Sequence, residues 1–120
     1  MSRQRQALGK RGEELARDFL SRQGYTILER NFRTRSGEID IIAQQGTTLI
    51  FIEVKTRTDN RFGSPFEAVT ERKRRAITRV ALEYLVGHGG PDRPCRFDVV
   101  AVYPGESPEV EIVRNAFEME

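Results

Sequence analysis

The sequence predicts an α/β fold in which helices flank a mixed β-sheet, and the order of its apolar patterns carries this prediction. An amphipathic helical pattern comes first, three strand-like segments follow it, and a second helical stripe precedes two further strand-like segments. A run of antiparallel strands followed by a helical crossover is typical of a mixed sheet with helices packed on it. We therefore expect the order α-β-β-β-α-β-β within one domain, residues 1–120, since this length supports a single modest core.

Apolar periodicity and turn residues define the first helix and the first three strands. The helix is expected over residues 7–23, where apolar side chains recur at helical spacing and Gly24 supplies a stop. Three strands are expected next, at 25–32, 38–43 and 48–56. The short glycine-centred connection between the last two makes them antiparallel neighbours.

The second half of the chain is expected to contain one long helix and two strands. The helix is expected over residues 65–86, with Thr70 as a candidate break, because "SPFE" (64–67) has the features of a capped helix start. The segment 95–103 is apolar enough for a central strand, whereas 109–113 alternates like an edge strand.

Composition excludes several classes of protein. The chain is 38% hydrophobic and 32% charged, with a formal net charge of +2, and we expect neither a membrane span nor a signal peptide. Cys95 is the single cysteine and His88 the single histidine, so an intrachain disulfide, a cysteine-based zinc site and a multi-histidine metal site are excluded. We expect a cytoplasmic protein whose chemistry depends on carboxylates and lysine.

Basic residues are concentrated in two parts of the chain. Residues 1–36 hold nine Lys or Arg against four acidic residues, and "RKRR" occupies positions 72–75. This asymmetry is compatible with a face that binds a polyanion such as nucleic acid. The alternative interpretation is an ordinary solvated helix surface, which basic helical residues often form.

The segment "LIFIEVKTR" (49–57) places two opposite charges directly after a strongly apolar run. Because side chains alternate along a strand, Glu53 and Lys55 are expected on one face of it, with the apolar neighbours on the other. Such charges at the end of a buried strand require partners, because burial of an unpaired charge costs several kcal/mol.

The preceding strand adds two more carboxylates. The same alternation places Glu38 and Asp40 on one face of that strand, and Ile39 and Ile41 on the other. Asp40 lies near the start of its strand and Glu53 near the end of the next. Antiparallel pairing can therefore bring these two carboxylates to the same end of the sheet.

Two carboxylates beside an ammonium group suit a hard divalent cation, Mg²⁺ or Mn²⁺, which prefers oxygen ligands. Such an ion polarises a phosphoryl oxygen and lowers the pKa of a bound water, while the lysine can orient or deprotonate that water. The pattern therefore indicates metal-assisted phosphodiester hydrolysis. The alternative is a set of ordinary cross-strand ion pairs, each of which contributes only about a few tenths of a kcal/mol.

Asp40 followed by "EVK" (53–55) resembles the split signature of the PD-(D/E)XK nuclease superfamily. A more specific resemblance covers most of the chain, from about Leu8 to Val102. It consists of "GKRGEELARDFLSRQGYTILERNFR", "GEIDIIA", "IFIEVKTR", "FGSPFEAV" and "FDVVAV". Together these look like the YraN-like family of small bacterial endonuclease-like proteins, which is similar in turn to archaeal Holliday junction resolvases.

The resemblance implies a restriction-endonuclease-like core and a set of site residues. Asp40 and Glu53 would be ligands of Mg²⁺ or Mn²⁺, Lys55 the catalytic lysine, and the Val54 carbonyl a further oxygen ligand. Glu13 matches an acidic position in the first helix of resolvase-like relatives, and it would complete the metal shell directly or through water.

The resemblance also implies a substrate and an assembly: DNA, including branched structures, bound by a homodimer. Arg33, Arg35, Arg57 and Lys73 are candidate nucleic-acid contacts, and their alternative is ordinary solvent exposure or, for Arg57, a salt bridge. Glu38 is expected either to bind metal through water or to pair with Arg57. A nucleic-acid-binding module that has the nuclease fold but little turnover is the alternative function.

Overall fold

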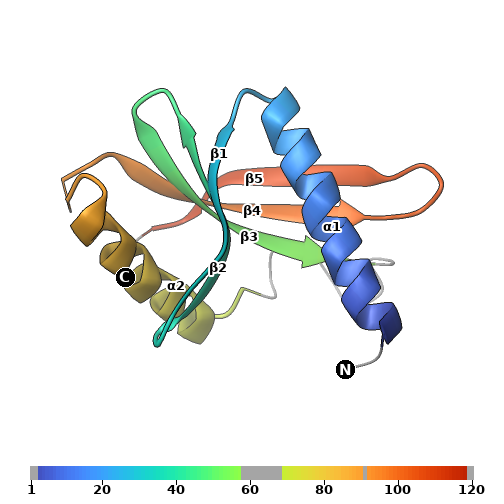
Figure 1. The fold of residues 1–120 in the computed structure, drawn as a ribbon, viewed down its shortest axis with the longest axis horizontal. Coiled ribbons are helices and arrows are strands. Elements are labelled where there is room, and N and C mark those ends of the chain that lie inside the picture. Colours follow the sequence, from blue (N-terminus) through green and yellow to red (C-terminus); the bar gives the residue numbers. More distant parts are fainter. Residues whose placement is uncertain (1–2, 58–68, 91, 119–120) are drawn as a thin grey trace.

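The computed structural model describes the backbone of residues 3–57, 69–90 and 92–118, and the side chains of these residues from residue 9 onward (Figure 1). Its elements are α1 (Arg3–Arg22), β1 (Thr26–Thr34), β2 (Gly37–Gln45), β3 (Thr48–Thr56), α2 (Glu71–Gly87), β4 (Cys95–Tyr103) and β5 (Glu109–Phe117). The expected α/β class and the expected order of elements are confirmed.

The five strands form one mixed sheet in the order β1-β2-β3-β4-β5. Neighbouring strands are antiparallel except β3 and β4, which run parallel from the Leu49–Cys95 pair to the Thr56–Val102 pair. A parallel pair needs a crossover connection, and α2 lies within the connection between these two strands. β3 is therefore the central strand, and its C-terminal end points towards α1 in Figure 1.

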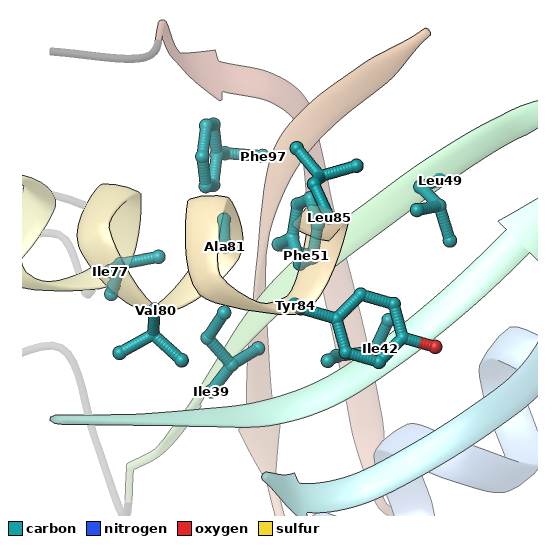
Figure 2. Packing of buried hydrophobic residues seen from close by; sticks show 10 residues of the cluster. All are labelled: Ile39, Ile42, Leu49, Phe51, Ile77, Val80, Ala81, Tyr84, Leu85 and Phe97. Atoms are coloured by element: carbon teal, nitrogen blue, oxygen red, sulfur yellow. The ribbon is translucent and has the colours of Figure 1, made fainter. Parts of the chain in front are cut away.

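α2 covers one face of the sheet, and Figure 2 shows the apolar cluster beneath it. Its ten buried members come from β2, β3, α2 and β4: Ile39, Ile42, Leu49, Phe51, Ile77, Val80, Ala81, Tyr84, Leu85 and Phe97. The Tyr84 ring meets the rings of Phe32 and Phe51 edge to face, at centroid distances of 5.2 and 6.1 Å. Aromatic pairs favour this arrangement, and the packing fixes α2 against the middle of the sheet.

α1 covers the opposite face with a second cluster, formed by Ala16, Leu20, Tyr25, Ile41, Ala43, Ile50, Ile52, Val100 and Val102. The helix ends in a turn at Gly24, whose φ is 89°, and the Tyr25 N–H donates to the Leu20 carbonyl at 3.0 Å. Towards its other end, a Cβ added to Gly12 would lie 3.0 Å from Thr56 Cβ. Glycine therefore permits α1 to approach the end of β3 closely.

Some boundaries differ from those expected. α1 begins at Arg3, and β1, β2 and β5 each extend beyond the predicted strand. α2 begins at Glu71, because the Thr70 hydroxyl caps it by accepting a hydrogen bond from the Lys73 N–H at 3.2 Å. The helix start expected at 64–67 lies outside the described residues. None of the described helices is long and apolar enough to cross a membrane.

A fully buried carboxylate joins β4 to β5 and to the turn after α1. Asp98 has 0% of its surface exposed, and its Oδ2 accepts a hydrogen bond from the Tyr25 hydroxyl at 2.9 Å. Its Oδ1 accepts from Arg96 Nε at 3.0 Å and from the Asn115 N–H at 2.9 Å. Arg114 Nε completes the network by donating to the Tyr25 hydroxyl at 3.1 Å. Both oxygens of this buried charge are therefore satisfied.

Candidate active site

The backbone ladder between β2 and β3 ends where the charged residues of these strands begin. Its last pair joins Ile41 to Ile52, and continuation of that register would pair Ile39 with Val54. The Val54 N–H instead donates to Asp40 Oδ2 at 2.8 Å. A carboxylate thus replaces a backbone carbonyl at this point, and a gap opens between the two strands.

β2 does not keep the same face throughout, which corrects the alternation expected from the sequence. Ile39 packs in the cluster beneath α2, whereas Ile41 packs in the cluster beneath α1. Opposite this stretch, Asn31 of β1 has a φ of 54°, a left-handed conformation that Asn tolerates better than most residues. The hairpin is therefore twisted locally, and the prediction that Ile39 and Ile41 share a face is wrong.

Glu53 lies beside the gap and has two lysines as neighbours. Its side chain is only 6% exposed, and Lys55 Nζ lies 3.4 Å from Glu53 Oε1. Lys73, in the first turn of α2, contacts the same oxygen through its own ammonium group. The side chains of Lys55 and Lys73 are 18% and 40% exposed, so both are partly withdrawn from solvent. This pairing offsets the cost of burying the glutamate.

Asn31 connects the two remaining carboxylates of the cluster. With its amide in the orientation that satisfies both groups, Asn31 Nδ2 donates to Glu38 Oε1 at 3.0 Å and to Glu13 Oε1 at 3.3 Å. Glu13 follows Gly12, at the place where α1 approaches the end of β3. The close approach of the helix thus brings a carboxylate from α1 towards those of the sheet.

Asp40 experiences the excess of negative charge most strongly. Burial and then the negative charges of Glu53, Glu13 and Glu38 raise its pKa to about 7, although the Val54 N–H opposes the shift. Like charges that share a site disfavour ionisation of the group between them. The gap therefore favours a cation or a proton at Asp40.

The two lysines differ in how firmly they hold their protons. Burial lowers the pKa of Lys55, and contact with the Lys73 side chain lowers it further, although Glu53 opposes this. Burial also disfavours the charge of Lys73, but its hydrogen bonds to Glu53 and Lys55 outweigh that effect and raise its pKa. Lys55 is consequently the better proton acceptor, and Lys73 the more permanent charge.

The donors around the gap are oxygens, although they do not form a complete coordination shell for a metal ion. Among residues 3–57, 69–90 and 92–118, no three His, Cys, Asp or Glu side chains are grouped so that they could hold a metal ion. Mg²⁺ commonly takes one or two protein carboxylates and completes its shell with water and phosphate oxygens. Asp40 and Glu53 supply that number, and the Lys73 ammonium marks a position that favours positive charge. Carboxylate oxygens are the type of donor that Mg²⁺ and Mn²⁺ prefer.

The residues expected to be catalytic lie in one cluster, linked by the contacts and charges described above: Glu13, Asp40, Glu53 and Lys55. The Val54 N–H also reaches the cluster, whereas the expected role of the Val54 carbonyl as a ligand stays a prediction. Lys73, a candidate phosphate contact or solvated helix residue, has its ammonium on Glu53 and so lies at the cluster. Asn31 was not foreseen, because it lies among the polar residues Glu29, Arg30 and Arg33 and the sequence pattern does not distinguish it from them.

The arginines expected to contact nucleic acid lie around the cluster rather than in it. Arg33 Nε is 3.4 Å from Glu38 Oε2, so Glu38 pairs with Arg33. Of the two roles expected for Glu38, the ion pair with Arg57 is replaced by this one, and metal binding through water stays a prediction. Arg35 is exposed in the turn between β1 and β2. The Arg57 N–H donates to the Val102 carbonyl at 2.9 Å and extends the pairing with β4, while its side chain is half-buried.

The sequence is similar to those of proteins from several organisms over almost its whole length. The model of the family described as "Uncharacterised protein family UPF0102" matches residues 12–102, a range that contains every member of the cluster. A UPF0102 protein of Geobacter metallireducens is 48% identical over 120 residues, which cover 99% of this chain and 98% of that protein. UPF0102 proteins of Symbiobacterium thermophilum and Desulfosudis oleivorans are 50% identical over 112 residues and 51% identical over 118. These matches cover 92% and 98% of this chain, and 95% of each relative.

Proposed function

The chain belongs to UPF0102, the YraN-like family that its sequence resembles, and we propose that it is a Mg²⁺- or Mn²⁺-dependent DNA endonuclease. Its reaction would be hydrolysis of a phosphodiester bond. More specifically, we propose that it cleaves branched DNA, in the manner of a resolvase. One observation carries it: Asp40 and Glu53 gather at a gap between two strands, next to a lysine whose pKa is lowered.

A purely structural ion network is a weaker explanation of this cluster. A network that stabilises a fold pairs each buried charge with donors or with an opposite charge. Asp40 instead lies among three other carboxylates, which raise its pKa and so reduce the stability of the ionised protein. Perturbed groups of this kind are concentrated at functional sites, where a ligand or an ion compensates them.

Each residue of the cluster has a role in the proposed reaction. Asp40 and Glu53 would hold the ion, and the Val54 N–H keeps the Asp40 carboxylate directed into the gap. When bound, the ion would polarise a phosphoryl oxygen and lower the pKa of a water. Lys55 would orient the attacking water or accept its proton. Lys73 would offset the negative charge that develops on the phosphate.

The central test compares the wild type with Glu53→Gln and Lys55→Ala on linear, nicked, flapped and four-way DNA, with Mg²⁺, Mn²⁺ or EDTA. We expect cleavage that requires the divalent ion and that falls by roughly 10²–10⁴-fold in either variant. Glu111→Gln is the matched control, since Glu111 is an exposed glutamate of β5, and it should cleave normally. Cleavage in EDTA, or normal cleavage by both site variants, would reject the proposal.

Glu13 and its neighbour Glu14 provide a second matched pair on α1. The amide of Asn31 holds Glu13 at the cluster, so Glu13→Gln should lower cleavage roughly 10- to 100-fold, as removal of an outer-shell partner of a metal site does. Glu14→Gln should have little effect. Equal losses in the two variants would indicate a general effect of charge on α1 instead of a role for Glu13.

A nucleic-acid-binding module with little turnover is the second candidate, and the Lys73–Glu53 ion pair is the observation that favours it. An ammonium group on Glu53 competes with a metal ion for the same oxygen. Lys73→Met separates the two candidates: an enzyme should bind Mg²⁺ more tightly and lose cleavage rate. A binding module should bind DNA equally well in EDTA and with Mg²⁺. Neither its wild type nor its Lys73→Met variant should cleave DNA.

A further inference from the structure

A hollow of about 520 Å³ lies between α2 and the turn that joins β1 to β2. Its lining residues are Ser36 from the turn and Arg72, Arg75, Ala76 and Arg79 from the helix. Three guanidinium groups thus surround one depression in the surface. None of these three arginines belongs to the cluster around Asp40.

The turn is fixed to α2 by hydrogen bonds, one of which engages the carboxylate of Glu83. The Ser36 hydroxyl donates to Glu83 Oε1 at 2.7 Å, and the Ser36 N–H donates to Thr34 Oγ1 at 3.1 Å. Gly37 lies so close to the helix that a Cβ there would be 3.7 Å from Val80 Cγ2. Hydrogen bonds to Thr34 and Ser36 lower the pKa of Glu83. The shape of the hollow is therefore built into the fold.

The arginines of the hollow have little internal compensation. Arg75 has one distant acidic neighbour, Glu71, at 4.0 Å. Within the described ranges no carboxylate pairs with Arg72 or Arg79, and both are exposed. Three guanidinium groups outnumber the carboxylates Glu71 and Glu83 near them and favour an anion, and their planar fork matches the oxygens of a phosphate.

The spacing of the arginines indicates an extended anion. Positions 72, 75 and 79 share one face of a helix, because three- and four-residue steps return to the same side. At about 1.5 Å per residue they span roughly 10 Å along the axis. Phosphates on one strand of a duplex follow each other at about 3.4 Å of rise. The row is thus long enough for two consecutive phosphates of one strand, whereas a single phosphate would occupy only part of it.

The first turn of α2 joins this hollow to the proposed active site. Arg72 lines the hollow, and the next residue, Lys73, reaches Glu53. We propose that the hollow binds backbone phosphates of duplex DNA beside the bond to be cleaved. The inference rests on the proposed function for the identity of the neighbouring site, but the binding itself requires no cleavage.

The test measures binding of a fluorescein-labelled 30-base-pair duplex by anisotropy, in EDTA, over a series of salt concentrations. Arg72→Gln/Arg79→Gln is compared with Arg17→Gln/Arg22→Gln, which removes two basic side chains from α1. We expect the first variant to bind roughly tenfold more weakly for every duplex sequence, with a salt slope lower by about 1.8. The control should keep most of the wild-type affinity and slope. Equal behaviour of the two variants would overturn the inference.

Competition by unlabelled anions identifies the kind of anion that the hollow binds. Unlabelled duplex should displace the probe from the wild type much better than ATP or inorganic pyrophosphate does, because only the duplex fills the whole row. If ATP displaces the probe equally well, the hollow is a site for small phosphorylated molecules and the inference fails. Equal displacement by poly-L-glutamate would likewise overturn it, since the hollow would then be a site for acidic protein.

The binding and cleavage experiments test the two proposals independently. If no DNA is cleaved under any condition but Arg72→Gln/Arg79→Gln still weakens binding, the proposed function is wrong and the inference about the hollow stands. If cleavage depends on Glu53 while the two double variants bind DNA alike, the proposed function stands and the inference about the hollow is wrong. Thermal melts of both double variants verify that each is folded.

Discussion

Asp98 and Asp40 are both carboxylates beside an irregularity of the same sheet. The register of β4 with β5 shifts next to Asp98, where Asn115 has a φ of 54°, and the β2–β3 ladder ends next to Asp40, where Asn31 has the same φ. In each place a backbone N–H donates to the carboxylate, at 2.9 Å from Asn115 and 2.8 Å from Val54. The local construction of the two sites is therefore similar.

Their wider surroundings are opposite. Asp98 also accepts hydrogen bonds from Tyr25 and Arg96, so positive charge and donors surround it completely. Asp40 faces three further carboxylates, and the lysines of the cluster contact Glu53 instead. The first arrangement is complete without a ligand, whereas the second leaves negative charge to be neutralised. A buried carboxylate thus indicates function only when its partners are like charges.

Removal of Asp98 should give the largest effect on stability. Asp98→Ala would leave Arg96 Nε, the Tyr25 hydroxyl and the Asn115 N–H without their acceptor, so we expect a loss of about 3–5 kcal/mol in the free energy of unfolding, measured by urea titration. Asp98→Asn, which keeps one acceptor oxygen, should lose less and provides the measurement if the alanine variant does not fold. A loss below about 1 kcal/mol in both variants would contradict the description of this network as closed.

Asp40→Asn should act in the opposite direction. The amide can still accept the Val54 N–H, and it carries no charge, so in EDTA at pH 8 we expect a gain of up to about 4 kcal/mol in stability. The reason is the pKa of about 7: the folded protein binds this proton more tightly than the unfolded chain, whose value is near 3.8. Wild-type stability should therefore fall as the pH rises from about 4 to about 7, and the variant should lack this fall. A destabilised variant at pH 8 would mean that Asp40 is compensated after all.

The contrast between these two aspartates also shows what the sequence could predict. The order of elements, the shared face of Glu53 and Lys55 and the proximity of Asp40 follow from local rules, namely strand alternation and a short hairpin. The change of face between Ile39 and Ile41 does not, because strand alternation assumes a regular pleat, whereas Asn31, opposite this stretch in β1, has a left-handed conformation.

Contacts between distant segments were harder still to predict. Lys73 joins the cluster only because α2 packs across the sheet with its first turn at Glu53, and helical periodicity gives no information on that position. The hydrogen bonds of Asn31 depend in the same way on the approach of α1 at Gly12. Sequence rules locate residues along an element, whereas the meeting of elements depends on their packing.

Divalent ions provide a third way to distinguish the two carboxylates. An ion that binds only the folded protein at tenfold excess over its Kd should add about 1.4 kcal/mol to the stability of the wild type. We expect this gain with Mg²⁺ or Mn²⁺ at pH 8, measured by thermal melts against EDTA. Asp40→Asn and Glu53→Gln should remove the gain, whereas Asp98→Asn should keep it. A gain that survives in Glu53→Gln would place the ion elsewhere on the molecule.

Tyr25→Phe should give the smallest effect and tests how the Asp98 network divides its energy. The ring stays packed against the cluster beneath α1, so only the hydroxyl is lost. That hydroxyl donates to Asp98 and accepts from Arg96 Nη2 at 2.9 Å and from Arg114 Nε. Because Asp98 keeps Arg96 and the Asn115 N–H, we expect a loss of about 1 kcal/mol in urea titrations. In the double variant with Asp98→Asn, the two losses should sum to more than the measured total, because both changes disrupt the same network. Strict additivity would mean that the tyrosine and the aspartate act independently. In that case only Arg96 and the Asn115 N–H would distinguish the surroundings of Asp98 from those of Asp40.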